Sequence, residues 1–381
     1  MIKIYRFLSP CVILLFTTFQ SFPLKPEEVN LRSHPPRIIR TCCMFGSRVG
    51  VVMVPFLKLS DITSPVKLGT HSFLGGSQEK NGVIYTRRGG FIDMGHLRDQ
   101  ADWTAYFYAL LTEEQGRGPH IRQLGYEGGG KSLMINIPAG MSGEEVLSLS
   151  GRIAYDLSVW HEIATWYGVS SVPLVSEQFS SFSPEDVYSN LLGVMLGIEA
   201  IKSDLPYHKA MTLLIREKLK ELEAVSSEEE TAAAMEAVRD IWWTRLRRYP
   251  SSKFVMLRYA FPYEPVCPFL IPSADAAPLI YEPVCLPPVN ALSCGEGTLY
   301  ELAIRLNHKF PLRMLFPGRG ERRITHRDFD ILIAHIRREY ETGFLIPGKI
   351  RKGNNTGGPP GMKERKRKSN AKKLKNEDHE G

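Results

Sequence analysis

Ionisable residues stand among apolar ones in three stretches of the first half of the chain, at 90–102, 160–168 and 176–193. Burying a histidine or a carboxylate costs free energy unless the group is paired, hydrogen-bonded or bound to a metal. In the first stretch Asp93, His96 and Asp99 follow at three-residue spacing, on adjoining parts of one helical face. This spacing lets a carboxylate orient the histidine, or lets two of the residues bind one metal ion. A His–Asp pair that only satisfies the start of a helix fits the same pattern.

The second stretch places His161 beside Glu162 on a predicted helix over 144–167. Apolar residues continue on two sides of this helix, so we expect both side chains to be buried. A buried glutamate beside a histidine is typical of a general base or of a metal ligand. The fourth residue after His161 is Thr165, which excludes the two-histidine zinc-protease motif. A hydrogen-bonded pair that only supports helix packing is the competing interpretation.

In the third stretch Glu177 lies in a predicted loop, and Asn190 interrupts an apolar stripe of the following helix. Glu177 would complete a site with the two histidines, and such nitrogen and oxygen ligands suit zinc or a similar divalent ion. We therefore predict one divalent metal and one catalytic base. The predicted metal ligands are His96, His161, Asp93 and Glu177, and the predicted base is Glu162.

Serine and cysteine offer alternative nucleophiles. No G-x-S-x-G elbow surrounds the serines at 176–183, and Ser183 is explained as a helix cap. A catalytic Cys42 or Cys43 needs a lowered thiol pKa, for which the neighbouring sequence offers no cause. We instead expect at least one disulfide between this pair and the C-terminal cysteines, which are Cys267, Cys285 and Cys294.

The N-terminus predicts export. Lys3 and Arg6 precede an apolar run at 7–16, and small or polar residues follow, which is typical of a secretory signal. An apolar N-terminal strand is the alternative. We expect residues 1–23 to form a signal peptide, residues 24–36 to form a linker or wrapping arm, and the protein to reach the periplasm or outer envelope.

The net charge of +7 resides in the C-terminal tail. From Lys349 onward 11 basic residues stand against four acidic ones, whereas residues 1–348 are neutral. The composition of 348–381 is typical of disorder. This tail can attract anionic surfaces, but the charge gives no support to nucleic-acid binding by the folded part.

Residues 125–132 match the phosphate-loop pattern G-x-x-x-x-G-K-S. Such a loop binds phosphate between a buried strand and the start of a helix. Here residues 116–124 make a poor buried strand, and residues 133–138 resemble a strand that ends at Pro138. We therefore expect a glycine-rich surface loop and no bound nucleotide.

The hydrophobic periodicity predicts an α+β fold that is predominantly helical. Short β-like runs over 49–92 predict a sheet or extended cover over a helical core. The predicted helices are 93–112, 144–167 with a Ser142–Glu145 capping box, 184–200 with a Ser183–Asp186 box, a long hairpin of 207–225 and 228–248, and 328–342.

We expect a single large globular domain over 37–347. Its motif-bearing part is 37–200, and a helical hairpin and proline-rich part make up 201–347. The proline-rich part repeats Tyr-Glu-Pro-Val-Cys at 263–267 and 281–285, and two copies are too few for a repeat architecture.

The three ionisable stretches, together with residues 40–46, His71 with Gly75 and Gly76, and residues 81–93, resemble the family called domain of unknown function 4056. The resemblance covers about 36–200 by motif and the C-terminal half by extent. It implies an exported bacterial envelope protein with no established activity, and it carries over no catalytic residue.

From the residues themselves we predict a metal-dependent hydrolase that acts on a small-molecule or cell-envelope substrate. The alternative is a non-enzymatic envelope-binding or structural protein. Clustering of the predicted site residues around one solvent-reachable cleft would favour the enzyme.

Overall fold

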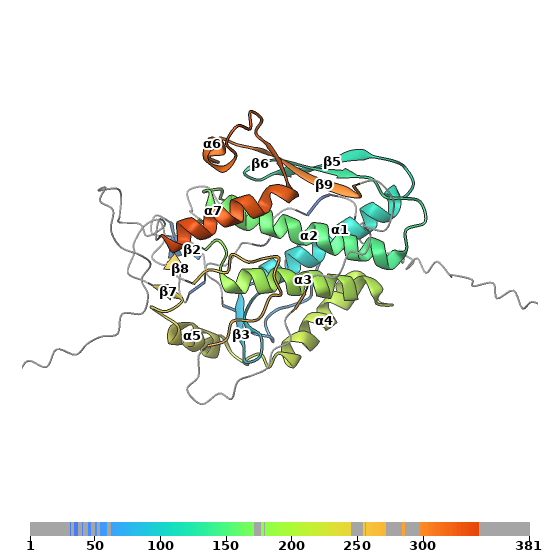
Figure 1. Ribbon diagram of the computed structural model, residues 1–381. Helices are drawn as coiled ribbons and strands as arrows, with labels where there is room; N and C mark the ends of the chain where they lie inside the picture. The colour runs from blue at the N-terminus through green and yellow to red at the C-terminus, as the bar shows by residue number, and fades with distance from the viewer. Residues whose placement is uncertain are drawn as a thin grey trace, which may run out of the picture. The chain divides into compact units, whose positions relative to one another are not determined.

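The computed structural model shown in Figure 1 describes residues 31, 34–36, 40, 45–46, 50–51, 54–58, 62–170, 177–178, 180–244, 254–255, 257–271, 284–285 and 298–342. Several predicted features lie outside the described residues: the signal peptide, most of the arm, Cys42, Cys43 and Cys294, and the tail from residue 348. Among the described residues, no helix combines the length and apolar character that a membrane crossing requires.

Three helices that pack against one another form the core: α1 (Met94–Glu114), α2 (Gly143–Trp166) and α3 (Pro184–Lys202). Small residues let α3 approach α1 closely. A Cβ at Gly193 would lie only 2.1 Å from the carbonyl oxygen of Leu97, and one at Gly197 would lie 3.0 Å from the Cα of Ala101. Since any larger side chain would push the helices apart, these glycines let the middle of α3 pack closely against the first two turns of α1.

Two helix caps follow the sequence patterns and one does not. Ser142 and Glu145 form the predicted capping box of α2, and the Asp93 carboxylate accepts the N–H groups of Gly95 and His96 at the start of α1. The box predicted for α3 is wrong, because the Ser183 side chain makes no cap hydrogen bond. Its hydroxyl instead lies 2.6 Å from Oε1 of Glu185 and 2.7 Å from Oδ2 of Asp186, so it contacts carboxylates of the first turn of α3.

Short antiparallel pairs make up the predicted β-containing N-terminal region. They are β1 (Gly50–Val51) with β2 (Val54–Lys58), and β3 (Val83–Thr86) with β4 (Gly90–Asp93). Strand β4 runs directly into α1 and contacts α3. The fold class is confirmed as a mixture of helices and strands in which helices predominate.

A four-stranded antiparallel sheet was not predicted from the sequence. Its strands, in spatial order, are β10 (Arg323–Thr325), β9 (Tyr300–Leu306), β6 (Gly129–Ile135) and β5 (His120–Tyr126). Strand β5 is at the edge and largely exposed, so it lacks the apolar alternation that marks a half-buried strand. The phosphate-loop look-alike is the turn between β5 and β6, and a strand rather than a helix follows it.

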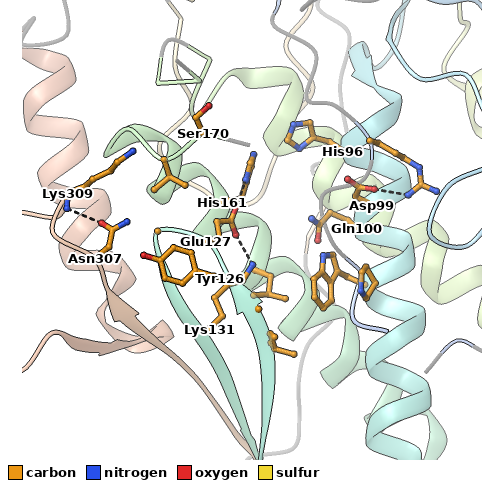
Figure 2. Close-up of a pocket in the computed structure, with 18 residues that line it drawn as sticks. His96, Asp99, Gln100, Tyr126, Glu127, Lys131, His161, Ser170, Asn307 and Lys309 are labelled. Carbon is orange, nitrogen blue, oxygen red and sulfur yellow. Dashed lines mark hydrogen bonds and ion pairs between the residues drawn. The ribbon is translucent and has the colours of Figure 1, made fainter. Parts of the chain in front are cut away.

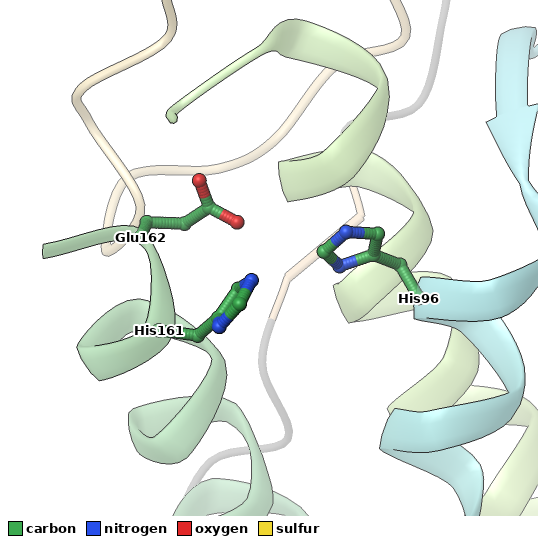
Figure 3. Close-up of side chains that lie close together, drawn as sticks. All are labelled: His96, His161 and Glu162. Atoms are coloured by element: carbon green, nitrogen blue, oxygen red, sulfur yellow. The ribbon is translucent and has the colours of Figure 1, made fainter. Parts of the chain in front are cut away.

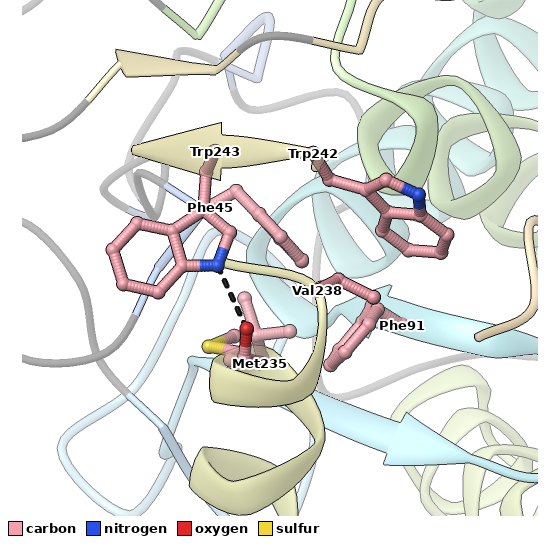
Figure 4. Packing of buried hydrophobic residues seen from close by; sticks show 7 residues of the cluster. Phe45, Phe91, Met235, Val238, Trp242 and Trp243 are labelled. Atoms are coloured by element: carbon pink, nitrogen blue, oxygen red, sulfur yellow. Dashed lines mark hydrogen bonds between the residues drawn. The ribbon is translucent and has the colours of Figure 1, made fainter. Parts of the chain in front are cut away.

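The predicted helical hairpin forms, but its second helix is shorter than expected. Its helices are α4 (Tyr207–Glu221) and α5 (Glu228–Ala237). After α5 the chain turns, with Asp240 at φ +63°, and Trp242 and Trp243 enter an apolar cluster with Phe45 and Phe91 (Figure 4). Burial of the two indole rings contributes more free energy than further turns of a solvent-exposed helix would. The pair β7 (Trp243–Thr244) and β8 (Phe254–Val255) follows.

The proline-rich repeat forms one backbone contact between its copies. Val266 and Val284 exchange N–H···O bonds of 3.0 and 2.9 Å. Cys267 beside them is an exposed free thiol. The expected partners Cys42 and Cys43 lie outside the described residues, so the disulfide prediction stays open.

The chain divides into two compact units, Met1–Ile333 and Ala334–Gly381. The last described elements are α6 (Leu312–Leu315), η2 (His326–Asp328) and α7 (Phe329–Glu341), and α7 crosses the boundary between the units. All residues of the candidate site belong to the first unit. The single-domain boundaries 37–347 stay a prediction.

Candidate metal centre

A pocket of about 670 Å³ is lined by α1, the β5–β6 turn and the C-terminal half of α2 (Figure 2). Trp103, Leu124 and Leu157 form an apolar part of its wall, and the imidazoles of His96 and His161 also line the pocket. Charged and polar residues make up much of the rest of the lining, among them Asp99 and Lys131. The two histidines therefore lie where a ligand can reach them.

His96 comes from the first turn of α1 and is held by α3. Its Nδ1 lies 3.0 Å from Oδ1 of Asn190, an acceptor, so Nδ1 donates and Nε2 carries the lone pair of the neutral ring. Nε2 faces Oδ1 of Asp186 at 3.4 Å. Two lone-pair atoms that face each other in a buried place need a proton or a cation between them.

His161 comes from the last turns of α2 and is held by the β5–β6 turn. Its Nδ1 lies 2.7 Å from Oε1 of Glu127. A carboxylate only accepts hydrogen bonds, so Nδ1 again carries the hydrogen and Nε2 is left for another contact. The rings of His96 and His161 lie with their centroids 5.7 Å apart.

Glu162 presents one carboxylate oxygen to the protein and leaves the other without a hydrogen bond. Oε2 accepts the backbone N–H of Phe182 at 2.5 Å. Phe182 has φ +56°, which costs a bulky residue about 1–2 kcal/mol. Oε1 is buried and has no hydrogen-bond partner within the described ranges. Strain at Phe182 is thus tolerated in a segment that orients Glu162.

Ligand-type atoms of His96, His161 and Glu162 all lie within 4.8 Å of one another (Figure 3). Two ligands of a tetrahedral zinc ion, each about 2.0–2.1 Å from the metal, are about 3.4 Å apart. The spacing therefore fits a metal after small side-chain shifts. A second group within 4.8 Å consists of Asp93, His96 and Asp186, so the two groups share His96.

Negative charge dominates around His96, because four buried carboxylates act on this part of the protein: Asp93, Glu162, Glu185 and Asp186. Burial lowers the pKa of His96, but the fields of Asp186, Asp93 and Glu162 outweigh burial and raise it to about 10. Burial raises the pKa of Glu185 to about 7 and that of Asp186 well above its usual range, although His96 opposes the latter. Such a cluster favours uptake of a cation.

The structure brings together part of the predicted site. His96, His161 and Glu162 meet, and Asp93 lies next to His96 while its Oδ1 caps α1. Glu177 belongs to neither group of ligand-type atoms found among the described residues. The roles of all five residues stay predictions.

Three residues of the site were not predicted. The sequence predicts Asp186 as a capping residue, Asn190 as a polar residue in an apolar stripe, and Glu127 as part of a surface loop. The S-x-x-D pattern at Ser183 and Asp186 is typical of a capping box, so it gave no indication of a site. Glu127, an acidic residue within a glycine-rich turn, was a signal from which a site residue could have been predicted.

Asp99, predicted on the same face as Asp93 and His96, joins a different cluster. Nη1 of Arg40 lies 2.7 Å from Oδ1 of Asp99 and 2.9 Å from Oδ2 of Asp102, and Nε lies 2.7 Å from Oε2 of Glu79. Asp102 has further contacts besides Arg40. One of its carboxylate oxygens lies 3.0 Å from Nε2 of His71.

Further donors to Asp102 are the Tyr207 hydroxyl and the Leu74 N–H, both at 3.0 Å. We call these residues the Arg40 cluster.

Comparison with protein families matches residues 31–266 to the family described as protein of unknown function, DUF4056. The chain belongs to the DUF4056 family. This confirms the resemblance seen in the sequence and extends it to residue 266. No curated protein and no solved structure shows significant similarity to the chain.

In this DUF4056 member the matched region contains both buried clusters and the β5–β6 turn. Strands β9 and β10 lie beyond it, as do Asn307 and Lys309, which line the pocket. The ligand-type residues are therefore part of the family region, while one side of the pocket is not.

Proposed function

We propose that this DUF4056 protein is a metal-dependent hydrolase in which His96, His161 and Glu162 hold one divalent ion beside the pocket. The observation that carries the proposal is the convergence of their ligand-type atoms within 4.8 Å. The remaining atoms, Nδ1 of both rings and Oε2 of the carboxylate, are already hydrogen-bonded. Partners of this kind orient the ligands of metal sites.

The pocket favours this group over the one formed by Asp93, His96 and Asp186. His96 and His161 line the pocket, whereas Asp93 and Asp186 do not. Asp93 also gives Oδ1 to two backbone N–H groups of α1. Asp186 then adds negative charge next to His96 without being needed as a ligand.

Three protein ligands leave one position of a tetrahedral ion for water, and zinc lowers the pKa of bound water to about 7. The hydrogen bonds at Nδ1 would keep both imidazoles in the tautomer that binds through Nε2, and both rings line the pocket from which a substrate would approach. Glu162 is assigned to the ion here, rather than to the role of base predicted from the sequence. A separate base is not required when bound water ionises near neutral pH.

We also propose that the protein acts outside the cytoplasm, on a small-molecule or cell-envelope substrate. Support for export comes from the basic start and short apolar run of residues 1–23. Fractionation of cells that express the full chain tests this, and recovery of the unprocessed chain in the cytoplasm would contradict it.

Elemental analysis of the purified full-length chain, after reconstitution with zinc, manganese or iron, tests the metal site. We expect about one equivalent of metal. His96→Ala, His161→Ala and Glu162→Gln should lose it, while His120→Gln, a histidine of β5 outside the pocket, should keep it. Chelation should abolish hydrolysis of a panel of chromogenic esters, amides and phosphoesters, and metal should restore it.

The variant Glu162→Gln also separates the two roles of this residue. A ligand that is lost takes the metal with it, whereas a lost base leaves the metal in place and removes only activity. Absence of metal from the reconstituted wild-type chain would overturn the proposal and favour the binding or structural protein.

A further inference from the structure

The glycine-rich turn between β5 and β6 resembles a phosphate loop in sequence, but its glycines pack closely against neighbouring segments. A Cβ at Gly129 would lie 2.3 Å from the carbonyl oxygen of Arg305, and Gly128, with φ +66°, lies against Val169 and Phe310. Glycine is needed at both positions because no side chain fits. The turn is consequently pressed against β9 and the loop after α2.

Hydrogen bonds fix the backbone of Glu127 in this turn. Its carbonyl oxygen accepts the indole N–H of Trp160 at 2.9 Å, and its own N–H donates to the carbonyl of Gly129 at 2.9 Å. Trp160 is fully buried and stacks on Phe310. The position of the Glu127 side chain is therefore set by packing that does not depend on the pocket.

Each oxygen of the Glu127 carboxylate has one partner. Oε1 lies 2.7 Å from Nδ1 of His161, and Oε2 lies 2.8 Å from Nζ of Lys131. All three side chains line the pocket and are about nine-tenths buried. Lys131 balances the carboxylate charge, so the pair adds an oriented acceptor to the site without adding net charge.

We infer that Glu127 is a positioning residue, which holds His161 in the tautomer whose Nε2 faces His96 and Glu162, and that Lys131 holds Glu127 in turn. The inference rests on the proposed metal site. An acceptor-only group on Nδ1 forces the hydrogen onto that nitrogen and leaves the lone pair on Nε2. The glycine-rich segment thereby acquires a role that its resemblance to a phosphate loop conceals.

Zinc affinity of the full-length chain, measured by competition with a chromogenic chelator, tests this role. Glu127→Ala should bind zinc about 10- to 100-fold more weakly. Glu127→Gln should lose less zinc affinity than Glu127→Ala, because the amide oxygen can still accept a hydrogen bond. The zinc affinity of Lys131→Met should lie between those of the two Glu127 variants. The matched control is Glu114→Gln, which removes a carboxylate lying 3.1 Å from Nε2 of His120 at the other end of β5. It should leave zinc affinity unchanged.

Nitrogen-15 NMR of the metal-free, histidine-labelled chain gives a readout that a merely structural role would not change. Above the pH at which His161 loses its second proton, the wild-type ring should show Nδ1–H, and Glu127→Ala should show a mixture. His161→Gln assigns the signal. Unchanged tautomer and unchanged zinc affinity in Glu127→Ala would overturn the inference, even if the variant is less heat-stable. Failure of the wild type to bind zinc would instead overturn the proposed function, and the tautomer would still decide the role of Glu127.

Discussion

Helix α1 carries two buried ionic clusters that are satisfied in different ways. On the side of His96, carboxylates of β4, α2 and α3 surround an imidazole, and Oε1 of Glu162 and Oδ1 of Asp186 make no hydrogen bond within the described residues. On the side of Asp99 and Asp102, the Arg40 guanidinium contacts three carboxylates. The second cluster thus contains a fixed cation, whereas two carboxylate oxygens of the first have no hydrogen bond in the part of the chain that the structure describes.

The difference shows how to separate a candidate site from a structural network of the same residue types. A guanidinium is always charged and supplies several fixed donors, so Arg40 pairs all three carboxylates of its cluster without a ligand. Nδ1 of His71 in this cluster has no hydrogen bond within the described residues, but it lies 3.4 Å from Oε1 of Glu79. In the His96 cluster, Oε1 of Glu162 and Oδ1 of Asp186, which have no hydrogen bond among the described residues, can be satisfied by a proton or by a bound cation. Incomplete satisfaction beside a pocket, rather than burial of charge alone, is what marks the functional candidate.

Removing the fixed cation should have the largest effect. Arg40→Met leaves Glu79, Asp99 and Asp102 buried without their partner, so we expect the free energy of unfolding to fall by about 3–5 kcal/mol in urea denaturation. Arg40→Lys keeps the charge but loses the forked geometry and should cost less. A loss within about 0.5 kcal/mol for Arg40→Met would mean that the cluster is not structural.

Binding of a divalent cation should stabilise the His96 cluster. At a free zinc concentration about 100 times the dissociation constant, binding adds about 2.7 kcal/mol to the free energy of unfolding. Thermal unfolding of the full chain with zinc and with chelator measures this gain. His161→Ala should show no gain, and an equal gain in that variant would place the zinc elsewhere.

Neutralising one carboxylate in each cluster should give effects of opposite sign. Asp102→Asn disrupts hydrogen bonds to Arg40 and His71, and we expect a loss of about 2 kcal/mol. Burial and neighbouring carboxylates disfavour the charged form of Asp186, so Asp186→Asn should stabilise the metal-free protein by about 0.5–1 kcal/mol at a pH where this carboxyl is ionised. Denaturation in the presence of chelator compares the two variants. Destabilisation by both would show that the clusters do not differ in charge balance.

The two clusters should also lose their contributions to the free energy of unfolding at opposite ends of the pH range. The pKa of His96 is raised to about 10, above its ordinary value, so the stability it contributes is complete below about pH 6.5 and is lost as pH rises through 10. The slope is at most about 1.4 kcal/mol per pH unit. In chelator-treated protein, His96→Gln should reduce the slope of the free energy of unfolding against pH. An unchanged slope would mean that another group causes the pH dependence.

In the Arg40 cluster the sign is reversed for Glu79 and Asp102, whereas burial raises the pKa of Asp99 to about 7 against the effect of Arg40. Burial opposes ionisation of Glu79 and Asp102, but Arg40 outweighs burial and lowers the pKa of both carboxyls. Their contribution is therefore present above the pKa of the unfolded chain, near 4, and is lost as pH falls through the lower folded pKa. Asp102→Asn should weaken this acid dependence and leave the alkaline one intact.

Much of the local structure was accessible from the sequence. Apolar periodicity located the helices of the core, and the Ser142–Glu145 pattern gave the start of α2, because these features depend on residues a few positions apart. The same reasoning singled out His96, His161 and Glu162. It missed β5, whose exposed edge position leaves no alternating pattern.

The partners of the ionisable residues were decided by tertiary structure. Each step of three residues turns a helix by about −60°, so two steps carry Asp99 about 120° away from Asp93, toward Arg40 instead of α3. Asp186 fits a helix cap by spacing, yet the close approach of α3 to α1 at Gly193 places its carboxylate beside His96.

Short-range pattern thus determined which residues this chain buries, since burial follows from periodicity along each helix. Long-range packing decided which of them meet, because a buried charge is satisfied by whatever the neighbouring elements present to it. Arg40 and Glu127 come from outside the helices that they serve, and only the folded chain brings them into contact.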